Sequence, residues 1–340
     1  MDIRYLFIRF FQKLVLLSNF IQRKTIRQKK IHLKGDEKIL ILKWDRIGDA
    51  IWSIHMCENL KANFPNLKIS VLSNNYNRFV FEENAHLFEE ILSIQQNPPY
   101  YLIKEIYRIF DIYLNPLIIF FKNKKLWKSL KNRGFDYTFN LTWRDYFAVA
   151  NYISPAIWWW LGIFNLLYKY PIIWHNEIWA TKQVALKWME IFDNVNISQL
   201  TLKNKDLKNI LIFLGGKDPN KLNSDIYQKI ILHFQKMWFS IKTLSDNKST
   251  KADFYLSKDD TSFMVWSRYL SDFLNDYDLF VGIDWGVLHY CARYIQTLSF
   301  CIASNYLSVH PFGKSLKKIY GASWRKAFEI DNIHYIVTKW

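Results

Sequence analysis

The sequence predicts an α/β protein made of two doubly wound units, and three observations lead to this prediction. Residues 38–49 contain a short apolar run that ends at a Gly-Asp pair and continues with the spacing of a helix. Residues 277–292 repeat this design with a different polar turn. The chain also has 340 residues, more than one hydrophobic core usually organises, so two domains are expected.

The first predicted strand covers residues 39–42, because a short, continuous, β-branched run is typical of a strand buried on both faces of a parallel sheet. Ile51 and Ile54 fit the helix that follows. The loop between them lies at the carboxyl end of the strand, where open α/β sheets bind their ligands. There Gly48 allows a backbone to approach closely, and Asp49 serves either as a helix cap alone or also as a base.

The later segment combines a predicted strand at 279–283, a turn at 284–286 and a helix that carries His289. Together with Arg46-Ile47-Gly48-Asp49, this turn resembles the bacterial heptosyltransferases of glycosyltransferase family 9. These are inverting enzymes that build the inner core of lipopolysaccharide. The family shows an R-x-G-D-like loop after an early strand and a D-[TS]-G-x-x-H turn after a late one.

A third match lies between these two, where a predicted strand at 210–214 is followed by Gly215, Gly216 and, further on, Lys221. The resemblance gives Lys221 the role of the family's phosphate-binding lysine. The matches come in the family's order and cover residues 36–312. Two departures concern the donor side: Trp285 replaces the family's Thr or Ser, and the family's Pro-Gly-Ala turn is here Leu-Gly-Gly.

The resemblance implies the GT-B architecture, in which two Rossmann-like doubly wound domains face each other across a cleft. Residues 1–35 are predicted to form a leader with a basic amphipathic N-terminal helix. Residues 36–195 are predicted to form an acceptor-binding domain with an aromatic and basic insertion, and residues 196–340 a nucleotide-sugar-binding domain. The polar stretch at 194–206 has the composition of a linker.

The implied reaction is transfer of a sugar, heptose from ADP-heptose, to a lipopolysaccharide core or related glycan, with Asp49 as general base. Lys217 and Lys221 would neutralise the donor diphosphate, so neither a metal nor another cofactor is implied. The donor-binding residues are predicted to be Gly215, Gly216, Lys217, Lys221, Asp284, Trp285, Gly286 and His289. The acceptor-binding residues are predicted to be Arg46, Gly48 and Arg144. Taken without the resemblance, His289 is interpreted as a structural histidine, and the resemblance makes a role in the site an equal alternative.

Composition indicates an anionic partner, because the net charge is +16 and the pI is near 9.5. Nucleic acid, anionic lipid and phosphorylated glycan all satisfy this charge; the resemblance favours the glycan and the lipid over nucleic acid. The three cysteines lack C-x-x-C spacing, so neither a disulfide framework nor a zinc site is predicted, and a reducing, cytoplasmic location is expected. The absence of G-x-G-x-x-G and P-loop motifs argues against nicotinamide and P-loop enzymes.

Three segments bear on membrane attachment. Residues 1–23 place an apolar stripe on one helical face, which predicts either a helix lying on the inner face of the cytoplasmic membrane or a helix docked on the protein's own core. Residues 147–174 contain one charged residue but also Pro155 and Pro171, which favours a peripheral segment over a spanning helix. Residues 100–130 are predicted to be a membrane-facing insertion or a helix pair with a solvated basic face.

Two further interpretations stay open at the level of sequence. Asp276-Tyr277-Asp278 has the D-x-D pattern of metal-binding transferases, but it directly precedes a predicted strand and is interpreted as a turn at the start of that strand. The rival function is a transferase-like scaffold without catalysis that holds an anionic glycolipid or nucleic acid. Trp285 supports this rival, whereas the combination of Asp49, Asp284 and Lys221 argues against it.

Overall fold

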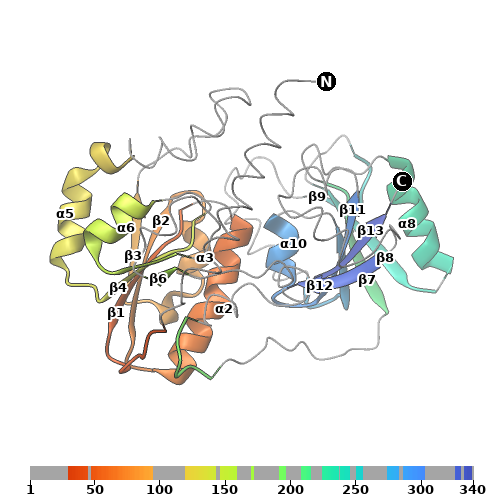
Figure 1. The fold of residues 1–340 in the computed structure, drawn as a ribbon. Helices are drawn as coiled ribbons and strands as arrows, with labels where there is room; N and C mark the ends of the chain where they lie inside the picture. Colours follow the sequence, from red (N-terminus) through yellow and green to blue (C-terminus); the bar gives the residue numbers. More distant parts are fainter. Residues whose placement is uncertain are drawn as a thin grey trace, which may run out of the picture. The chain divides into compact units, whose positions relative to one another are not determined.

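The structure is a computed structural model, and it separates into two compact units, each drawn in Figure 1. Unit 1 contains the described residues up to 196, and unit 2 contains those from 208 onward. The predicted domain boundaries at 35 and 195 stay predictions. The structure describes residues 30–44, 47–94, 119–142, 146–158, 170–171, 191–196, 208–215, 224–236, 238–245, 250–255, 274–282, 286–302, 326–330 and 333–338.

Unit 1 is built on a six-stranded sheet with the order β3-β2-β1-β4-β5-β6, and every neighbouring pair is parallel. Its strands are β1 (Lys38–Leu42), β2 (Lys68–Asn74), β3 (Glu90–Ile94), β4 (Tyr137–Asn140), β5 (Ala156–Trp158) and β6 (Tyr170–Pro171). Residues 39–42 are fully buried, as expected for a strand covered on both faces. The chain first runs outward from β1 to β3 and then returns to β4 on the other side of β1.

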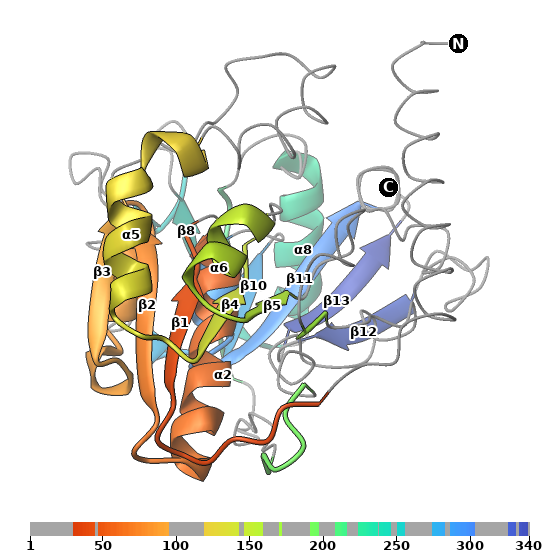
Figure 2. The same ribbon diagram turned by 60° about the vertical axis from the view of Figure 1, so that its left-hand side comes forward.

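This reversal distributes the helices over both faces of the sheet. The helices are α2 (Ile47–Asn63), α3 (Arg78–Glu82), the 3₁₀ turn η1 (Ala85–Leu87), α5 (Lys124–Asn132) and α6 (Phe147–Ile153). In Figures 1 and 2, α2 and α3 cover one face, whereas α5 and α6 lie together on the other. Right-handed crossovers in opposite directions from β1 produce this arrangement. Unit 1 is therefore doubly wound, as predicted.

Residues 31–33 complete unit 1 by joining residues 191–194. The Ile31 N–H donates to the Ile191 carbonyl at 2.9 Å, and the Asp193 N–H donates to the Ile31 carbonyl at 3.1 Å. The Asn194 side chain exchanges two hydrogen bonds with the backbone of Leu33. The chain segment just before β1 and the segment that ends unit 1 are thus held against each other.

Unit 2 has a seven-stranded sheet with the order β12-β13-β11-β10-β7-β8-β9. Its strands are β7 (Asn209–Phe213), β8 (Ser240–Ser245), β9 (Phe254–Tyr255), β10 (Leu279–Gly282), β11 (Gln296–Ile302), β12 (Lys326–Ile330) and β13 (Ile333–Thr338). All neighbouring pairs are parallel except β12 and β13, which pair antiparallel. Here the winding direction reverses between β7 and β10.

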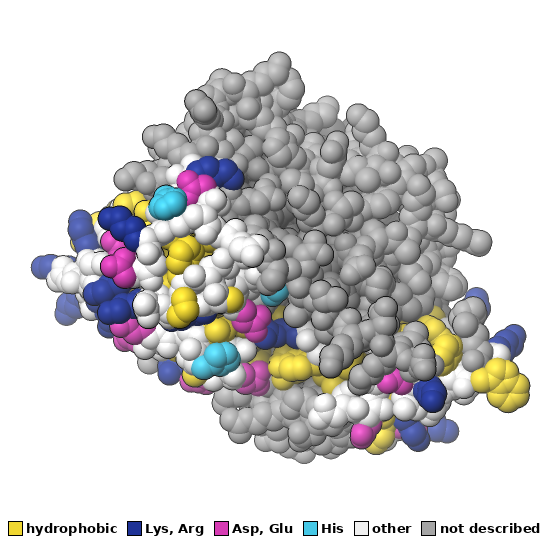
Figure 3. Space-filling model, turned by 90° about the horizontal axis from the view of Figure 1, so that it is seen from below, with side chains coloured by type: hydrophobic (Ala, Val, Ile, Leu, Met, Phe, Trp, Pro, Cys, Tyr) yellow, Lys and Arg dark blue, Asp and Glu magenta, His cyan; other side chains and the backbone are white. Residues whose placement is uncertain are grey.

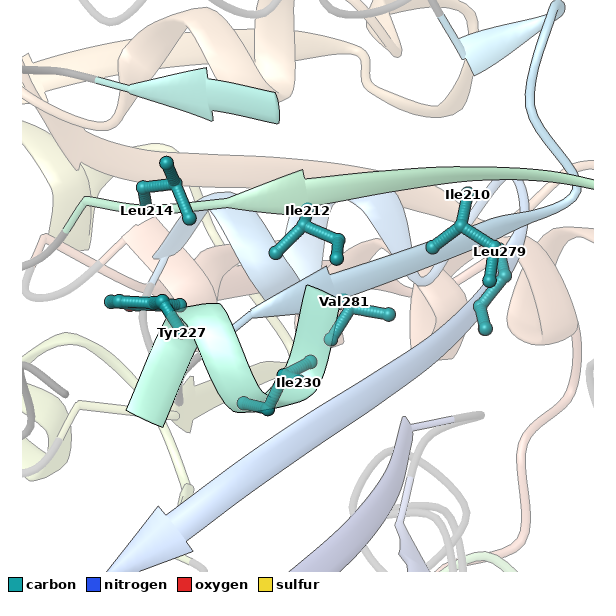
Figure 4. Close-up of a cluster of buried hydrophobic side chains, with 7 residues drawn as sticks. All are labelled: Ile210, Ile212, Leu214, Tyr227, Ile230, Leu279 and Val281. Carbon is teal, nitrogen blue, oxygen red and sulfur yellow. The ribbon is translucent and has the colours of Figure 1, made fainter. Parts of the chain in front are cut away.

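The core of unit 2 has two parts, because successive side chains along its two central strands point to opposite faces of the sheet. One face packs under α8 (Ser224–Lys236), where Tyr227 and Ile230 lie against the side chains of β7 and β10 shown in Figure 4. The opposite face packs near α10 (Gly286–Cys291), since Leu288 comes close to Gly282. A Cβ at Gly282 would lie 3.3 Å from the Phe280 ring and 3.4 Å from Leu288 Cδ1, so the glycine permits this close packing.

Each sheet has an aspartate that aligns its two central strands, and the two aspartates occupy equivalent positions. In unit 1, Asp136 precedes β4 and its carboxylate accepts a hydrogen bond from the Lys38 N–H at 2.8 Å. In unit 2, Asp278 precedes β10 and accepts from the N–H groups of Lys208 and Asn209 at 3.0 and 2.9 Å. The predicted turn at the start of the strand is therefore confirmed for Asp278, whose carboxylate binds backbone at the amino end of the sheet.

The apolar stretch at 147–174 contributes to the sheet of unit 1. Its described residues form α6, β5 and β6, and Ala156 and Ile157 are fully buried. In the part of the chain that the structure describes, no helix is long and apolar enough to cross a membrane. The predicted amphipathic helix at 1–23 and the segments 100–118 and 159–169 lie outside the described residues.

Candidate functional site

The candidate residues follow four particular strands. The predicted acceptor and catalytic residues come after β1 and β4, and the predicted donor residues come after β7 and β10. In each unit these two strands are hydrogen-bonded neighbours at the point where the winding direction reverses. Doubly wound sheets bind ligands outside the carboxyl ends of their strands at this switch point. The topology therefore places the segments from both halves of the sequence prediction at the positions where such folds bind ligands.

Several candidates lie within the described backbone. Helix α2 begins at Ile47, so the backbone of Gly48 and Asp49 is in its first turn. Gly286 is the first residue of α10, and His289 lies in the same short helix. Gly215 follows β7 by two residues, and its carbonyl accepts a hydrogen bond from the Tyr227 hydroxyl at 3.4 Å.

The remaining candidates, and some side chains, fall elsewhere. The side chains of Asp49 and His289 are not among those that the structure describes. Seven predicted site residues lie outside the described residues, namely Arg46, Arg144, Gly216, Lys217, Lys221, Asp284 and Trp285. Their assignment stays a prediction, supported by the strands that they follow in the sequence.

A buried lysine, which the sequence prediction missed, joins the two central strands of unit 1. Lys43 directly follows β1 and is fully buried, and its Nζ donates to the Leu141 carbonyl, just beyond β4, at 2.6 Å. The backbone repeats the link, because the Leu141 N–H donates to the Leu42 carbonyl at 3.1 Å. A buried ammonium must be hydrogen-bonded to offset the loss of hydration. Lys43 thereby holds together the strand ends from which the candidate acceptor loops emerge.

Two asparagines, one at the end of β2 and one directly before α3, fix the backbone at the start of the loop after β1. The Asn77 amide donates to the Lys43 carbonyl at 3.0 Å, and the Asn74 amide donates to the Trp44 carbonyl. The Asn74 side-chain oxygen in turn accepts from the backbone N–H groups of Tyr76 and Asn77 at 2.8 and 2.9 Å. Both asparagines are buried, so these hydrogen bonds hold the backbone of Lys43 and Trp44 in one geometry.

An aromatic cluster lies beside the same loop. The Trp44 ring stacks on Trp127 of α5 with centroids 6.3 Å apart, and it meets the Tyr146 ring edge-on at 4.5 Å. Trp44 is only 5% exposed, and its Nε1 is buried without a hydrogen-bond partner among the described residues. The Trp127 Nε1 donates to the Phe120 carbonyl at 2.9 Å. Trp44, two residues after β1, is thus packed directly against α5.

The described thiols are packing groups. Cys57 and Cys291 are both buried and carry no disulfide. Burial raises the pKa of the Cys291 thiol well above its ordinary value, which keeps the sulfur protonated and unreactive. Among the described residues there is no group of three or more His, Cys, Asp or Glu side chains that would hold a metal ion.

Two doubly wound α/β units define this protein as having a GT-B-like fold, and solved structures share it. A glycosyl transferase family 9 protein from Veillonella parvula DSM 2008 has a TM-score of 0.53 and 13% identity, with 80% of this chain and 83% of that chain covered. E. coli heptosyltransferase WaaC with ADP has a TM-score of 0.52 and 12% identity, with 77% and 87% covered.

The same E. coli enzyme with ADP-2-deoxy-2-fluoro heptose gives a TM-score of 0.51 at 13% identity, with 77% of this chain and 88% of that chain covered. No protein-family model matches the sequence, and no curated protein matches it. At these identities the likeness establishes the fold. The predicted fold class and the resemblance to heptosyltransferases are confirmed at that level.

Proposed function

We propose that this protein is an inverting, metal-independent glycosyltransferase that transfers heptose from ADP-heptose to a lipopolysaccharide core or a related anionic glycan. One observation carries the proposal. The predicted catalytic and acceptor residues follow the switch-point strands of unit 1, and the predicted donor residues follow those of unit 2, in a fold that resembles a heptosyltransferase.

In the proposed reaction, an acceptor hydroxyl oxygen attacks the anomeric carbon on the face opposite the diphosphate. Asp49 takes the hydroxyl proton as the new carbon–oxygen bond forms. The bond to the diphosphate breaks, ADP leaves with the electron pair, and the configuration at the anomeric carbon inverts. Lys217 and Lys221 neutralise the charge that develops on the diphosphate, which supplies the stabilisation that a metal provides in other transferases.

The donor and acceptor assignments have separate support. ADP-heptose as donor is supported by the likeness to the E. coli heptosyltransferase, whose structures are with ADP and with ADP-2-deoxy-2-fluoro heptose. An anionic acceptor is supported by the net charge of +16 and by Arg46 and Arg144, whose guanidinium groups suit phosphates and carboxylates. We assign the protein to the cytoplasmic face of the inner membrane, where such an acceptor is lipid-linked.

The proposal is tested by thermal denaturation of the purified protein with ADP, UDP, GDP or CMP, each with and without magnesium. A ligand that binds only the folded state at about a hundred times its Kd stabilises it by roughly 2.7 kcal/mol. We expect ADP to raise the Tm equally with and without magnesium. A shift with a different nucleotide would change the donor sugar. A lack of any shift would favour the rival function, a scaffold that binds glycolipid or nucleic acid without catalysis.

A further inference from the structure

Helix α5 and the turn before it carry a one-sided basic surface. Residues 119–134 contain five lysines and one arginine but no acidic residue. Trp127 and Leu130 point into unit 1 and are fully buried, whereas the lysines are exposed. Two cations at the end of the helix already have partners: Arg133 pairs with Glu90, and Lys131 lies 4.7 Å from the centroid of the Tyr152 ring.

The other four lysines belong to the same segment as an exposed aromatic ring, and one of them contacts that ring. Phe121 is 60% exposed, and the Lys124 Nζ lies 5.1 Å from the centroid of its ring. Lys122, Lys125 and Lys128 are exposed, and no acidic side chain among the described residues pairs with them. We call Phe121, Lys122, Lys124, Lys125 and Lys128 the α5 surface.

On the face drawn in Figure 3, basic, acidic and histidine side chains of the described residues are intermixed, whereas residues 119–134 carry no acidic side chain. A mixed surface attracts neither sign of charge strongly. The α5 surface instead has four lysines without an acidic partner among the described residues and one exposed apolar ring. It combines attraction to anions with a group that gains by leaving water. Anionic lipid headgroups offer this combination, because lysines bind their phosphates and an aromatic ring enters the boundary layer below.

The position of α5 in unit 1 brings this surface near the candidate acceptor loop. On the buried side of the helix, Trp127 stacks on Trp44, and Trp44 directly precedes the loop that contains Arg46. The exposed side therefore lies across one helix from the candidate acceptor loop. A bilayer in contact with α5 would bring a lipid-linked acceptor to the unit that is predicted to bind it.

We propose that the α5 surface docks the protein on an anionic phospholipid bilayer. This inference goes beyond the transfer reaction and rests on the proposed function only for the identity of the lipid-linked acceptor. Nucleic acid would complement the charge of the α5 surface. A single exposed ring does not suit nucleic acid, however, because binding of single strands uses several stacking aromatics along a groove. The commitment is therefore to lipid, with nucleic acid as an outcome of the test.

The experiment is flotation of the full chain with vesicles of phosphatidylglycerol and with vesicles of phosphatidylcholine. The test variant neutralises three lysines, Lys122→Gln, Lys125→Gln and Lys128→Gln. Each lysine near an anionic surface strengthens binding roughly fivefold, so the triple variant should bind phosphatidylglycerol vesicles about a hundredfold more weakly. Phe121→Ala should weaken binding by roughly tenfold through lost apolar contact.

The matched control removes the same charge from exposed lysines of unit 2, by Lys229→Gln, Lys236→Gln and Lys251→Gln. Trp238→Ala is the control for an exposed aromatic ring, since Trp238 is 95% exposed. We expect both controls to bind vesicles like the unaltered protein. Unchanged vesicle binding by the triple lysine variant of α5, or an equal loss in the lysine control, would overturn the inference. It would also be overturned if the α5 variant lost more affinity for a polynucleotide than for vesicles.

The nucleotide-dependent Tm separates this inference from the proposed function. If the α5 variant loses vesicle binding but keeps the Tm shift with ADP, the variant is folded and both proposals hold. Vesicle binding without any shift in the unaltered protein contradicts the transferase proposal alone. A shift with ADP, together with vesicle binding that does not depend on α5, contradicts the docking surface alone.

Discussion

Asp49 is the residue on which the proposed chemistry depends. General bases contribute about 10²–10⁴-fold to rate, so Asp49→Asn should lower transfer by about that factor, because the amide cannot take the acceptor proton. Donor binding is assigned to unit 2, so the Tm shift with ADP should persist. Initial rates with a soluble glycan acceptor, measured alongside that shift, check both expectations.

Glu58 provides a matched control for Asp49. It is the other carboxylate of α2, and its Oε2 lies 3.6 Å from His55 Nδ1, three residues away on the same helix. We expect Glu58→Gln to leave transfer within a few-fold of the unaltered rate. Full activity of Asp49→Asn would remove this residue as the base.

The D-x-D motif gives a residue-level prediction on stability. Asp278 accepts two backbone hydrogen bonds that align β7 with β10, whereas Asp276 is exposed. Hydrogen bonds to charged groups contribute about 1.5–3 kcal/mol when buried, and this carboxylate is only partly buried, so Asp278→Ala should lower the free energy of unfolding by about 1–2 kcal/mol. Urea denaturation measures this, and Asp276→Ala should have little effect. An equal loss in both variants would contradict the assigned role.

Sequence reasoning at the residue scale located segments better than contacts. The Gly-Asp pair and the Asp-Trp-Gly sequence are recognisable because each comes shortly after a buried strand. Lys43, Asn74 and Asn77 were missed, since their partners lie 98, 30 and 34 residues away in the chain. Only pairing of β1 with β2 and β4 brings these groups together, and no local pattern reports that pairing.

At the scale of elements, the strands that enter the core were predictable. Predicted runs at 39–42, 210–214 and 279–283 correspond to β1, β7 and β10 within about a residue at each end. Continuous β-branched runs are a local signal of burial on both faces. The stretch at 147–158 was harder to interpret because apolar composition is the same for a protein core and for a membrane. The structure assigns it to α6 and β5.

The turn that leads into β1 predicts a pH dependence of stability. Burial alone would raise the pKa of Glu37, but hydrogen bonds from the N–H groups of Lys34 and Gly35 outweigh it, so the pKa is lowered. A lowered pKa in the folded state stabilises the fold above the unfolded value, near pH 4.3, and this contribution is lost as pH falls through the folded pKa.

Comparison of unfolding midpoints checks this expectation. Glu37→Gln should destabilise the protein at neutral pH, and the difference from the unaltered chain should shrink as the pH falls below about 4. Glu89→Gln, at the turn before β3, is a matched control, because its carboxylate accepts no hydrogen bond from the turn before β1. A difference that stays constant with pH would show that Glu37 acts through packing instead.

At the scale of the whole molecule, the two units repeat one plan. In each unit the chain adds strands on one side of its first central strand and then continues on the other side. In each unit an aspartate also joins the two central strands at their amino ends by accepting backbone hydrogen bonds. This repetition was visible in the sequence as two strand-turn-helix segments. The antiparallel pair of β12 and β13 at the edge of unit 2 was not predicted, because edge pairing depends on the completed sheet.

The proposed assignment of the donor to unit 2 and the acceptor to unit 1 predicts where donor binding protects backbone amides from hydrogen exchange. If the nucleotide sugar binds unit 2, ADP should slow amide hydrogen exchange in the segments that follow β7 and β10, near Gly215 and Gly286, because bound ligand suppresses local opening. Exchange after β1 and β4 should change little until an acceptor is added. Peptide-resolved exchange with ADP measures this, with GDP as the control nucleotide. Protection confined to the segments after β1 and β4 would assign the donor to unit 1 instead. Protection after β7 and β10 would support donor binding at the switch point of unit 2, which leaves the switch point of unit 1 for the acceptor.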